Sequence, residues 1–148
     1  MSEELVEVNM IYDKAKWHVD GRFPTNLPTS QALVHIGFFL GWAVNNALVS
    51  ESFVSEFGDE ITKFKDGTIT GPQLLGIAGE TLSSDELNPT GNLFAGAYYA
   101  TGQYFEDYGD TMCKDLPSAY HVSDSQNNFE ATSRILNRRF TIWRQTNG

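Results

Sequence analysis

Residues 32–48 are apolar at nearly every position, and this stretch limits what the chain can fold into more than any other part of the sequence. Its apolar residues are Ala32, Leu33, Val34, Ile36, Phe38, Phe39, Leu40, Trp42, Val44 and Leu48. A helix at the surface of a domain has a polar face, whereas a helix that is apolar all round must be enclosed by other elements. Thr29 or Ser30 can cap such a helix at its start. The sequence therefore predicts a buried central helix over residues 30–49.

Other segments have the apolar spacing and the end signals of further helices. Ser50 can cap a helix whose apolar residues recur at helical spacing, and Thr70 precedes a Gly-Pro pair that suits a helix start. Asp124 can cap the last helix of the chain. The helices predicted in this way cover residues 51–65, 70–79, 88–108 and 124–144.

Three segments carry weaker signals. Residues 83–87 can form a short helical turn, and residues 1–11 alternate weakly between apolar and polar positions, which is compatible with a short strand. Gly96 and Gly102 weaken the helix predicted around them. A chain of 148 residues has the size of one domain. We therefore predict an all-α fold: a single compact domain of five to six helices around the helix 30–49, with at most a minor N-terminal strand.

The charge of the chain is unevenly distributed, with a net charge of −9. Between Lys65 and Lys114 there is no lysine or arginine, while the same stretch contains many aspartates and glutamates. An acidic surface without basic residues repels nucleic acid and attracts a basic partner. Near the C-terminus, Arg138 and Arg139 could bind a phosphate group, although two arginines beside an acidic domain more often form salt bridges. The charge pattern favours a protein that binds a basic protein and does not bind nucleic acid directly.

Tyrosines and acids lie close together in the second half of this acidic stretch. Tyrosine offers a large contact area with little conformational entropy to lose, and it is enriched at protein interfaces. Acids around such rings would complement a basic partner. The alternative is that part of these rings belongs to the core. The candidate partner-binding residues are Tyr104, Glu106, Asp107, Tyr108 and Asp110, together with Asp59 and Glu60 on the polar face of the helix 51–65.

The sequence contains no recognisable motif for catalysis or for binding a cofactor. The three histidines, His18, His35 and His121, are far apart, and no pair has the local spacing typical of a metal site. His35 lies on the predicted central helix, where a histidine is usually a core residue hydrogen-bonded to a carboxylate or a carbonyl group. The sequence thus predicts no catalytic residue, no cofactor and no bound metal. Two alternatives stay open: a three-histidine site assembled by the fold, and a small-molecule pocket near Trp17 and the three histidines.

Several features favour the cytoplasm. The N-terminus, Met-Ser-Glu-Glu, is acidic where a signal peptide is basic. The single cysteine, Cys113, excludes an intramolecular disulfide and fits a reducing compartment. The most apolar stretch, residues 32–44, is shorter than the roughly 20 residues that a membrane-spanning helix needs. We expect a cytoplasmic protein with no membrane partner, which could form a homodimer.

Distinctive motifs recur along most of the chain. They are Asp13-Lys14-Ala15-Lys16-Trp17-His18, Phe23-Pro24, Leu27-Pro28, Gln31-Ala32, Val34-His35-Ile36-Gly37, Phe39-Leu40-Gly41-Trp42, Leu48-Val49-Ser50, Ile69-Thr70-Gly71-Pro72-Gln73-Leu74, Asn88 to Asn92, Tyr104-Phe105-Glu106-Asp107-Tyr108, Leu116-Pro117-Ser118 and Tyr120-His121-Val122. With these motifs the chain resembles, over about residues 12–143, an uncharacterised family of small bacterial cytoplasmic proteins. Members of that family look like the immunity proteins that accompany polymorphic toxins. The resemblance carries over no catalytic residue.

The resemblance and the charge pattern together lead to one expected function. We expect an immunity protein, and not an enzyme, that binds and neutralises a cognate toxin domain with a basic surface in the cytoplasm. The toxin could be a nuclease, because proteins that act on nucleic acid are commonly basic where they bind it. The alternative is a small-molecule-binding domain or an enzyme that uses the histidine pocket, and a third possibility is a structural homo-oligomer.

Overall fold

A computed structural model describes residues 10–147 of the chain. It is 64% helical, which confirms the predicted all-α fold. Within the described residues, the α-helices are α1 (Ala15–Val19), α2 (Val34–Asn45), α3 (Glu51–Lys65), α4 (Gly71–Ile77), α5 (Pro89–Tyr98), α6 (Gln103–Met112) and α7 (Gln126–Asn147). The shorter elements are the 3-10 helices η1 (Thr29–Leu33) and η2 (Ala119–His121) and the strands β1 (Ile11–Lys14) and β2 (Thr81–Ser83).

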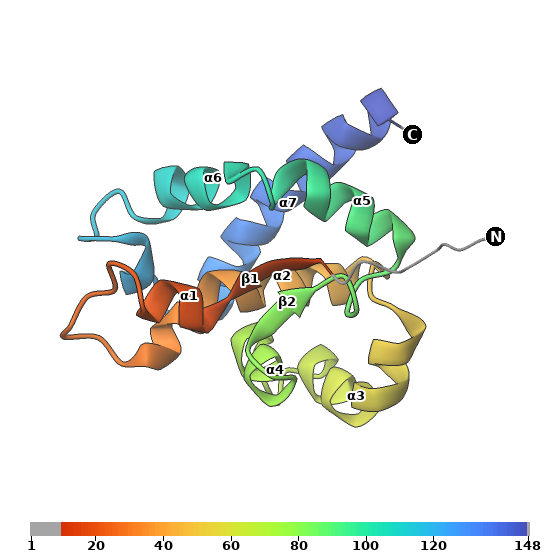
Figure 1. The fold of residues 1–148 in the computed structure, drawn as a ribbon, viewed down its shortest axis with the longest axis horizontal. Helices are drawn as coiled ribbons and strands as arrows, with labels where there is room; N and C mark the ends of the chain where they lie inside the picture. The colour runs from red at the N-terminus through yellow and green to blue at the C-terminus, as the bar shows by residue number, and fades with distance from the viewer. Residues whose placement is uncertain (1–9, 148) are drawn as a thin grey trace.

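Helix α2 is the buried central element predicted over residues 30–49. Every residue from Val34 to Val44 is buried, and α5 and α6 lie on one side of this helix while α3 and α4 lie on the other (Figure 1). The predicted range is longer than α2, because residues 29–33 form the tighter helix η1 and α2 ends at Asn45. Although α2 is apolar, no helix in the described part of the chain is long and apolar enough to cross a membrane.

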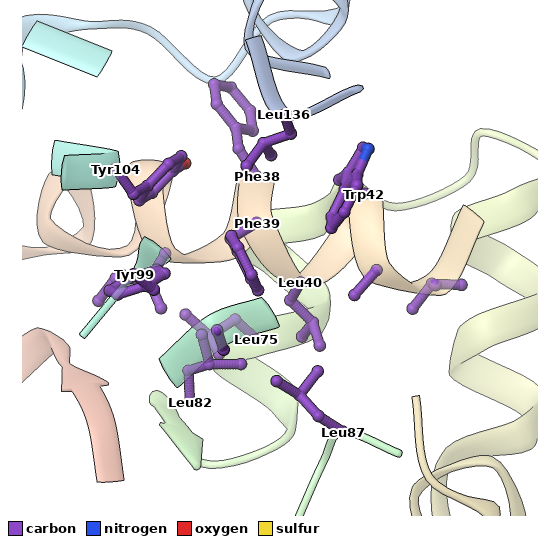
Figure 2. Close-up of a cluster of buried hydrophobic side chains, with 14 of the residues drawn as sticks. Phe38, Phe39, Leu40, Trp42, Leu75, Leu82, Leu87, Tyr99, Tyr104 and Leu136 are labelled. Atoms are coloured by element: carbon purple, nitrogen blue, oxygen red, sulfur yellow. The ribbon is translucent and has the colours of Figure 1, made fainter. Parts of the chain in front are cut away.

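Aromatic side chains around Phe39 form the middle of the core (Figure 2). The ring of Phe39 lies 5.0 to 6.3 Å, between centroids, from four other aromatic rings. These rings belong to Trp42, Phe94, Tyr99 and Tyr104. Helix α7 closes the core with the fully buried Leu136, and Trp42 donates a hydrogen bond from Nε1 to Oδ1 of Asn137 at 2.8 Å. The core therefore ties α2 to α5, α6 and α7.

Glycines allow α4 to lie directly against α2. A Cβ atom at Gly37 would overlap the backbone of Pro72, and a Cβ atom at Gly71 would overlap the carbonyl group of Gly37. Any larger side chain at either position would push the two helices apart. The small residues of α2 thus serve close helix packing within one domain.

Local sequence signals predict two helix starts correctly. The Ser50 side chain accepts a hydrogen bond from the backbone N–H of Phe53 at the start of α3. Thr70 forms a capping box with Gln73 at the start of α4, in which each residue bonds to the backbone of the other. These caps satisfy N–H groups that would otherwise lack a partner in the first helical turn.

Two other helix predictions are wrong in detail. Ser125, and not Asp124, accepts a hydrogen bond from the first turn of α7, because the Asp124 carboxylate already accepts one from the hydroxyl of Thr70 at 2.6 Å. The helix predicted over residues 88–108 is divided into α5 and α6. Gly102 adopts a left-handed φ of 89° there, which breaks the helical path.

The strands form a two-stranded antiparallel sheet. Asp13 on β1 pairs with Leu82 on β2. The prediction of a helical turn over residues 83–87 is therefore partly wrong, since the segment begins as the end of β2. Most of the weak strand signal at residues 1–11 falls on positions outside the described residues.

Candidate functional site

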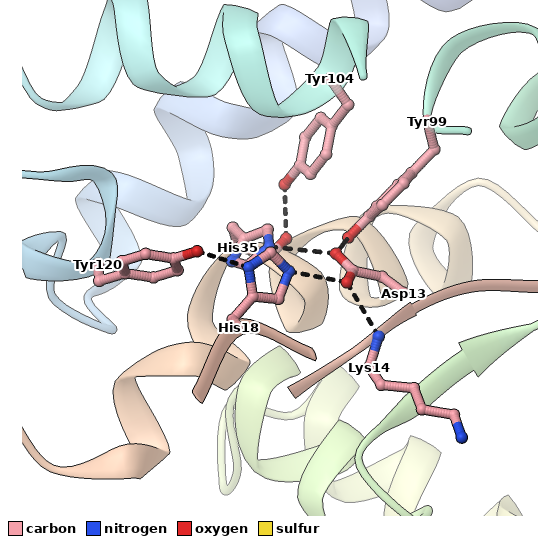
Figure 3. A network of polar contacts seen from close by, with 7 residues as sticks. All are labelled: Asp13, Lys14, His18, His35, Tyr99, Tyr104 and Tyr120. Carbon is pink, nitrogen blue, oxygen red and sulfur yellow. Dashed lines mark hydrogen bonds and ion pairs between the residues drawn. The ribbon is translucent and has the colours of Figure 1, made fainter. Parts of the chain in front are cut away.

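Asp13, His18 and His35 come together from three different elements (Figure 3). Asp13 lies on β1, His18 on α1, and His35 in the first turn of α2. The backbone is still extended at Lys14 and becomes helical at Ala15, so α1 brings His18 back beside the strand. Asp13 and His35 are buried, while the side chain of His18 is 17% exposed. The cluster is therefore largely enclosed but reaches solvent at His18.

The Asp13 carboxylate is the centre of this cluster. Its Oδ1 lies 2.7 Å from Nε2 of His18, and its Oδ2 lies 3.2 Å from Nε2 of His35. The two Nε2 atoms are 3.2 Å apart. Oδ1 also accepts a hydrogen bond from the backbone N–H of Lys14 at 2.9 Å, and Oδ2 accepts one from the hydroxyl of Tyr99. Both imidazoles thus direct the same ring nitrogen at one carboxylate.

Tyrosines from more distant segments hold the cluster in place. The hydroxyl of Tyr120, on η2, lies 2.6 Å from Nδ1 of His18. The hydroxyl of Tyr104, on α6, donates to the backbone carbonyl of His35 at 2.6 Å. Tyr99, which follows α5, holds the carboxylate from a third direction. Three segments remote from β1 therefore hold the carboxylate of Asp13, the imidazole of His18 and the backbone of His35 in place.

Burial and hydrogen bonding set the protonation states of the cluster. Burial raises the pKa of Asp13, but the hydrogen bonds from His18 and His35 outweigh this effect and hold the pKa well below its ordinary value. Burial lowers the pKa of His35, although Asp13 partly opposes the change. Burial also raises the pKa of the Tyr99 hydroxyl well above its ordinary value. At neutral pH the site therefore holds a carboxylate, a neutral His35 imidazole and a protonated tyrosine.

The pocket considered from the sequence is only partly assembled. His18 and His35 meet, whereas His121 lies outside their cluster, and its Nδ1 forms a hydrogen bond with the hydroxyl of Ser118 at 2.8 Å. Trp17 is 52% exposed, so its ring does not line an enclosed pocket. The expectation that His35 bonds to a carboxylate in the core agrees with its contact to Asp13.

Sequence reasoning missed Asp13, Tyr99 and Tyr120 as members of the site. Asp13 has a local signal, since it lies five residues before His18, and that spacing could place the two side chains at a strand-to-helix junction. Tyr99 and Tyr120 carry no local signal, because their closeness to the histidines depends on how α5 and η2 pack.

The rings of Tyr104 and Tyr108 are fully buried, and this finding corrects the prediction that they contact a partner. The two residues are four positions apart on α6, so their rings share the face that packs toward α2. Their aromatic neighbours include Phe39 for Tyr104 and Phe38 for Tyr108. The tyrosines of the acidic stretch are core residues in these two cases.

The side chain of Asp107 is also bound by other residues of the chain. Its carboxylate accepts two hydrogen bonds from Arg139, at 2.8 and 3.1 Å, one from Tyr98 at 2.6 Å and one from Gln103 at 2.9 Å. Arg139 therefore forms the salt bridge that the sequence favoured for it. A carboxylate with this many intramolecular donors has little capacity left for a partner.

The remaining acids of the predicted set lie on two separate surfaces. Asp59 and Glu60 lie on α3, whereas Glu106 and Asp110 lie on α6. Figure 1 places α3 and α6 on opposite sides of α2. Glu60 is partly exposed and the other three are exposed. The predicted residues therefore do not form one continuous contact surface.

Comparison with known proteins identifies one family. Residues 11–122 match the family described as "Domain of unknown function (DUF7832)". The matched range includes the strands, the helices α1 to α6 and every residue of the cluster around Asp13, but it ends before α7. No curated protein and no solved structure matches the chain.

Proposed function

This chain belongs to the DUF7832 family, and we propose that it acts as an immunity-type protein, which binds and neutralises a cognate toxin domain in the cytoplasm. The toxin would present a basic surface to the acidic surface of this chain. The proposal rests on the resemblance of the sequence to immunity proteins and on one structural observation, a set of exposed acids that form no salt bridge with any described residue.

Exposed acids without an ion pair are abundant between residues 51 and 110. Within the described residues, Asp107 is the only acid of this range that forms a salt bridge. The exposed acids without one are Glu51, Glu56, Asp59, Asp66, Glu80, Asp85, Glu106 and Asp110. Uncompensated charge of one sign speeds the encounter with a partner of opposite charge.

Helix α3 carries Glu51, Glu56, Asp59 and Glu60 along most of its length, and its two lysines, Lys63 and Lys65, lie in its last turn. Burial raises the pKa of Glu86, and the negative charges of Asp85 and Glu56 raise it further, which shows that acids of α3 and of the segment after β2 act on one another. Val54 on the same helix is 47% exposed. Interfaces combine an apolar centre with a polar rim, so the surface of α3 is the better candidate for partner binding, and Asp59 and Glu60 stay in the proposed set.

The test is co-expression of this chain with the product of the neighbouring gene, which the proposal expects to contain a toxin domain. We expect the chain to protect the cells and to elute with the toxin domain as one complex. Asp59→Lys combined with Glu60→Lys should slow association by about tenfold or more at low salt, because steering by charge contributes a factor of about 10 to 1,000. The effect should shrink at high salt, where charges are screened.

The matched control is Glu106→Lys combined with Asp110→Lys, which makes the same change of charge on the opposite side of α2. This pair should slow association less. If the control pair has the larger effect, the toxin binds at α6 instead of α3. If cells die equally with and without this chain and no complex forms, the immunity proposal is wrong.

A second candidate is an enzyme or a small-molecule-binding domain that uses the cluster around Asp13. The observation in its favour is the chain of contacts from Tyr120 through His18 to Asp13, which could move a proton between solvent and the interior. His18→Gln separates the two candidates. Protection against the toxin should survive this substitution, whereas an activity of the cluster should not.

A further inference from the structure

The cluster of Asp13, His18 and His35 has the form of a metal site. Each residue offers one ligand atom, and these atoms lie within 4.8 Å of one another. The ligands come from β1, α1 and α2, so the folded domain has to hold three elements in place to create the cluster (Figure 3). The contacts are independent of the acidic surface on α3.

We propose that Asp13, His18 and His35 bind a divalent transition-metal ion of the zinc type. The inference does not depend on the proposed toxin, because it concerns residues on another part of the molecule. A bound ion would lie between one carboxylate oxygen and the two Nε2 atoms.

The spacing of the ligand atoms fits such an ion. Zinc binds imidazole nitrogen at about 2.0–2.1 Å and carboxylate oxygen at about 2.0–2.2 Å, usually with tetrahedral geometry. Two ligands of a tetrahedral ion are therefore separated by about 3.3 Å. The two Nε2 atoms lie 3.2 Å apart, and the contact between Asp13 and His35 is also 3.2 Å. The contact between Asp13 and His18, at 2.7 Å, would lengthen by about half an ångström.

The chemistry of the donors selects the class of ion. Two imidazoles with one carboxylate occur in zinc and non-haem iron(II) sites. Magnesium and calcium prefer sites made entirely of oxygen ligands. Neutral imidazole is the form that binds a metal, and the ring of His35 is buried beside the aromatic rings of Phe105 and Tyr108.

Hydrogen bonds behind the ligands support the same assignment. In metal sites the second nitrogen of a ligating histidine commonly bonds to another group, which orients the ring. Nδ1 of His18 has such a partner in the hydroxyl of Tyr120, and the carboxylate of Asp13 has one in the hydroxyl of Tyr99. With an ion on Nε2, His18 would carry its proton on Nδ1 and donate it to the oxygen of Tyr120.

The charge of the site also favours a cation. The Asp13 side chain is only 9% exposed, yet among the described residues it forms ion pairs with no lysine or arginine. A buried charge is costly unless an opposite charge or a full set of hydrogen bonds compensates it. The competing explanation is that the donors Lys14, His18, His35 and Tyr99 stabilise the carboxylate without any metal.

This proposal departs from the sequence-based expectation that the chain holds no metal. That expectation rested on the lack of a local pair of ligands. Here the ligands are separated by 5 and 17 residues along the chain, and they meet only because α1 packs against β1 and against η1, which leads into α2.

The test uses the whole purified chain. Elemental analysis should find one transition-metal ion per chain, and titration of the chelator-treated protein with Zn²⁺ should show one site. His18→Gln and Asp13→Asn should each weaken Zn²⁺ binding by more than about 100-fold. Removing a residue that only hydrogen-bonds to a metal ligand, here called an outer partner, typically lowers metal affinity by about 10- to 100-fold, and removing a ligand itself should cost more. Tyr120→Phe, which removes only an outer partner, should weaken binding by about tenfold.

His121→Gln is the matched control, because it removes a histidine that lies outside the cluster. It should bind Zn²⁺ like the unmodified chain. Circular dichroism checks that each variant is folded. If a ligand variant does not fold, Tyr120→Phe and the unmodified chain still decide the question. The inference is overturned if the folded, unmodified chain binds no Zn²⁺, or if binding persists in His18→Gln, or if His121→Gln loses it. Any of these results would mean that hydrogen bonds alone hold the cluster together.

Discussion

At the scale of single residues, Asp107 illustrates how an acid of the base-free stretch can serve structure instead of binding. It connects α6 with α7 through Arg139, and it receives further hydrogen bonds from Tyr98 and Gln103. Burial raises the pKa of Asp107, but these hydrogen bonds, with the one from Arg139 foremost, outweigh burial and lower the pKa. The acid is therefore more readily ionised in the folded chain than in the unfolded one.

This difference predicts an effect of pH on stability. The pKa of Asp107 in the folded chain lies below its value of about 3.9 in the unfolded chain. Ionised Asp107 therefore stabilises the folded chain fully above about pH 3.9, and this stabilisation is lost as the pH falls through the pKa of the folded chain. Asp107→Asn should cost about 1–3 kcal/mol at pH 7, since hydrogen bonds to a charged group are lost. Urea unfolding at several pH values measures this. The difference in free energy of unfolding between the unmodified chain and Asp107→Asn should become smaller below about pH 4. A difference that stays constant with pH would contradict a lowered pKa of Asp107 in the folded chain.

At the scale of elements, two glycines help to set the positions of α4, α5 and α6. Gly37 lets α4 approach α2, and Gly102 separates α5 from α6 by adopting a left-handed conformation. Gly37 matters because it has no side chain to block the neighbouring helix, and Gly102 matters because its backbone adopts a conformation that other residues rarely adopt. A helix pattern in the sequence does not distinguish these two roles from an ordinary glycine inside a helix.

Gly37→Ala tests the close packing of α2 and α4. The new methyl group would overlap the backbone of Pro72, which cannot turn away as a side chain could. Overpacking of this kind typically costs about 1–3 kcal/mol, occasionally more. Gly96→Ala is the matched control, because a Cβ atom there meets nothing within 4 Å. It should stabilise the chain by up to about 1 kcal/mol. Thermal unfolding measures the stability of both variants. Equal changes in stability in Gly37→Ala and Gly96→Ala would contradict the close packing of α2 against α4.

At the scale of the whole molecule, α7 completes a core that the rest of the chain begins. The family match ends at residue 122, before this helix. Nevertheless, α7 supplies the buried Leu136 and the partner of Trp42, and its Phe140 lies against the rings of Trp42 and Phe94. The matched region therefore leaves a large apolar surface uncovered when it is taken alone.

A chain that ends at Val122 should consequently fail to fold cooperatively. Loss of α7 would expose large side chains that are at most 1% exposed in the complete domain: Phe38, Trp42 and Phe94. A chain that ends at Arg144 is the control, because residues 145–147 are exposed. Thermal unfolding followed by circular dichroism should show a sharp transition for the control only. A sharp transition in the shorter chain would mean that residues 10–122 form an independent core.

The sequence by itself determined the elements whose signals are local. The apolar run around Phe39 predicts a buried helix, because no polar face is available for water. Ser50 as a cap and the sequence Thr70-Gly71-Pro72 predict the starts of α3 and α4, because both signals act within the first turn of the helix. The prediction that Asp124 caps the last helix is wrong, because its carboxylate accepts a hydrogen bond from Thr70, which is distant along the chain.

Only the tertiary structure decided which polar and aromatic residues are available for function. Tyr104 and Asp107 are close in sequence to acids that remain exposed. The ring of Tyr104 is nevertheless buried in the core, and the carboxylate of Asp107 is bound by Arg139. Asp13 and His35 meet although they are 22 residues apart. Such contacts depend on how helices pack, and periodicity along the chain carries no information about which distant side chains a packed interior brings together.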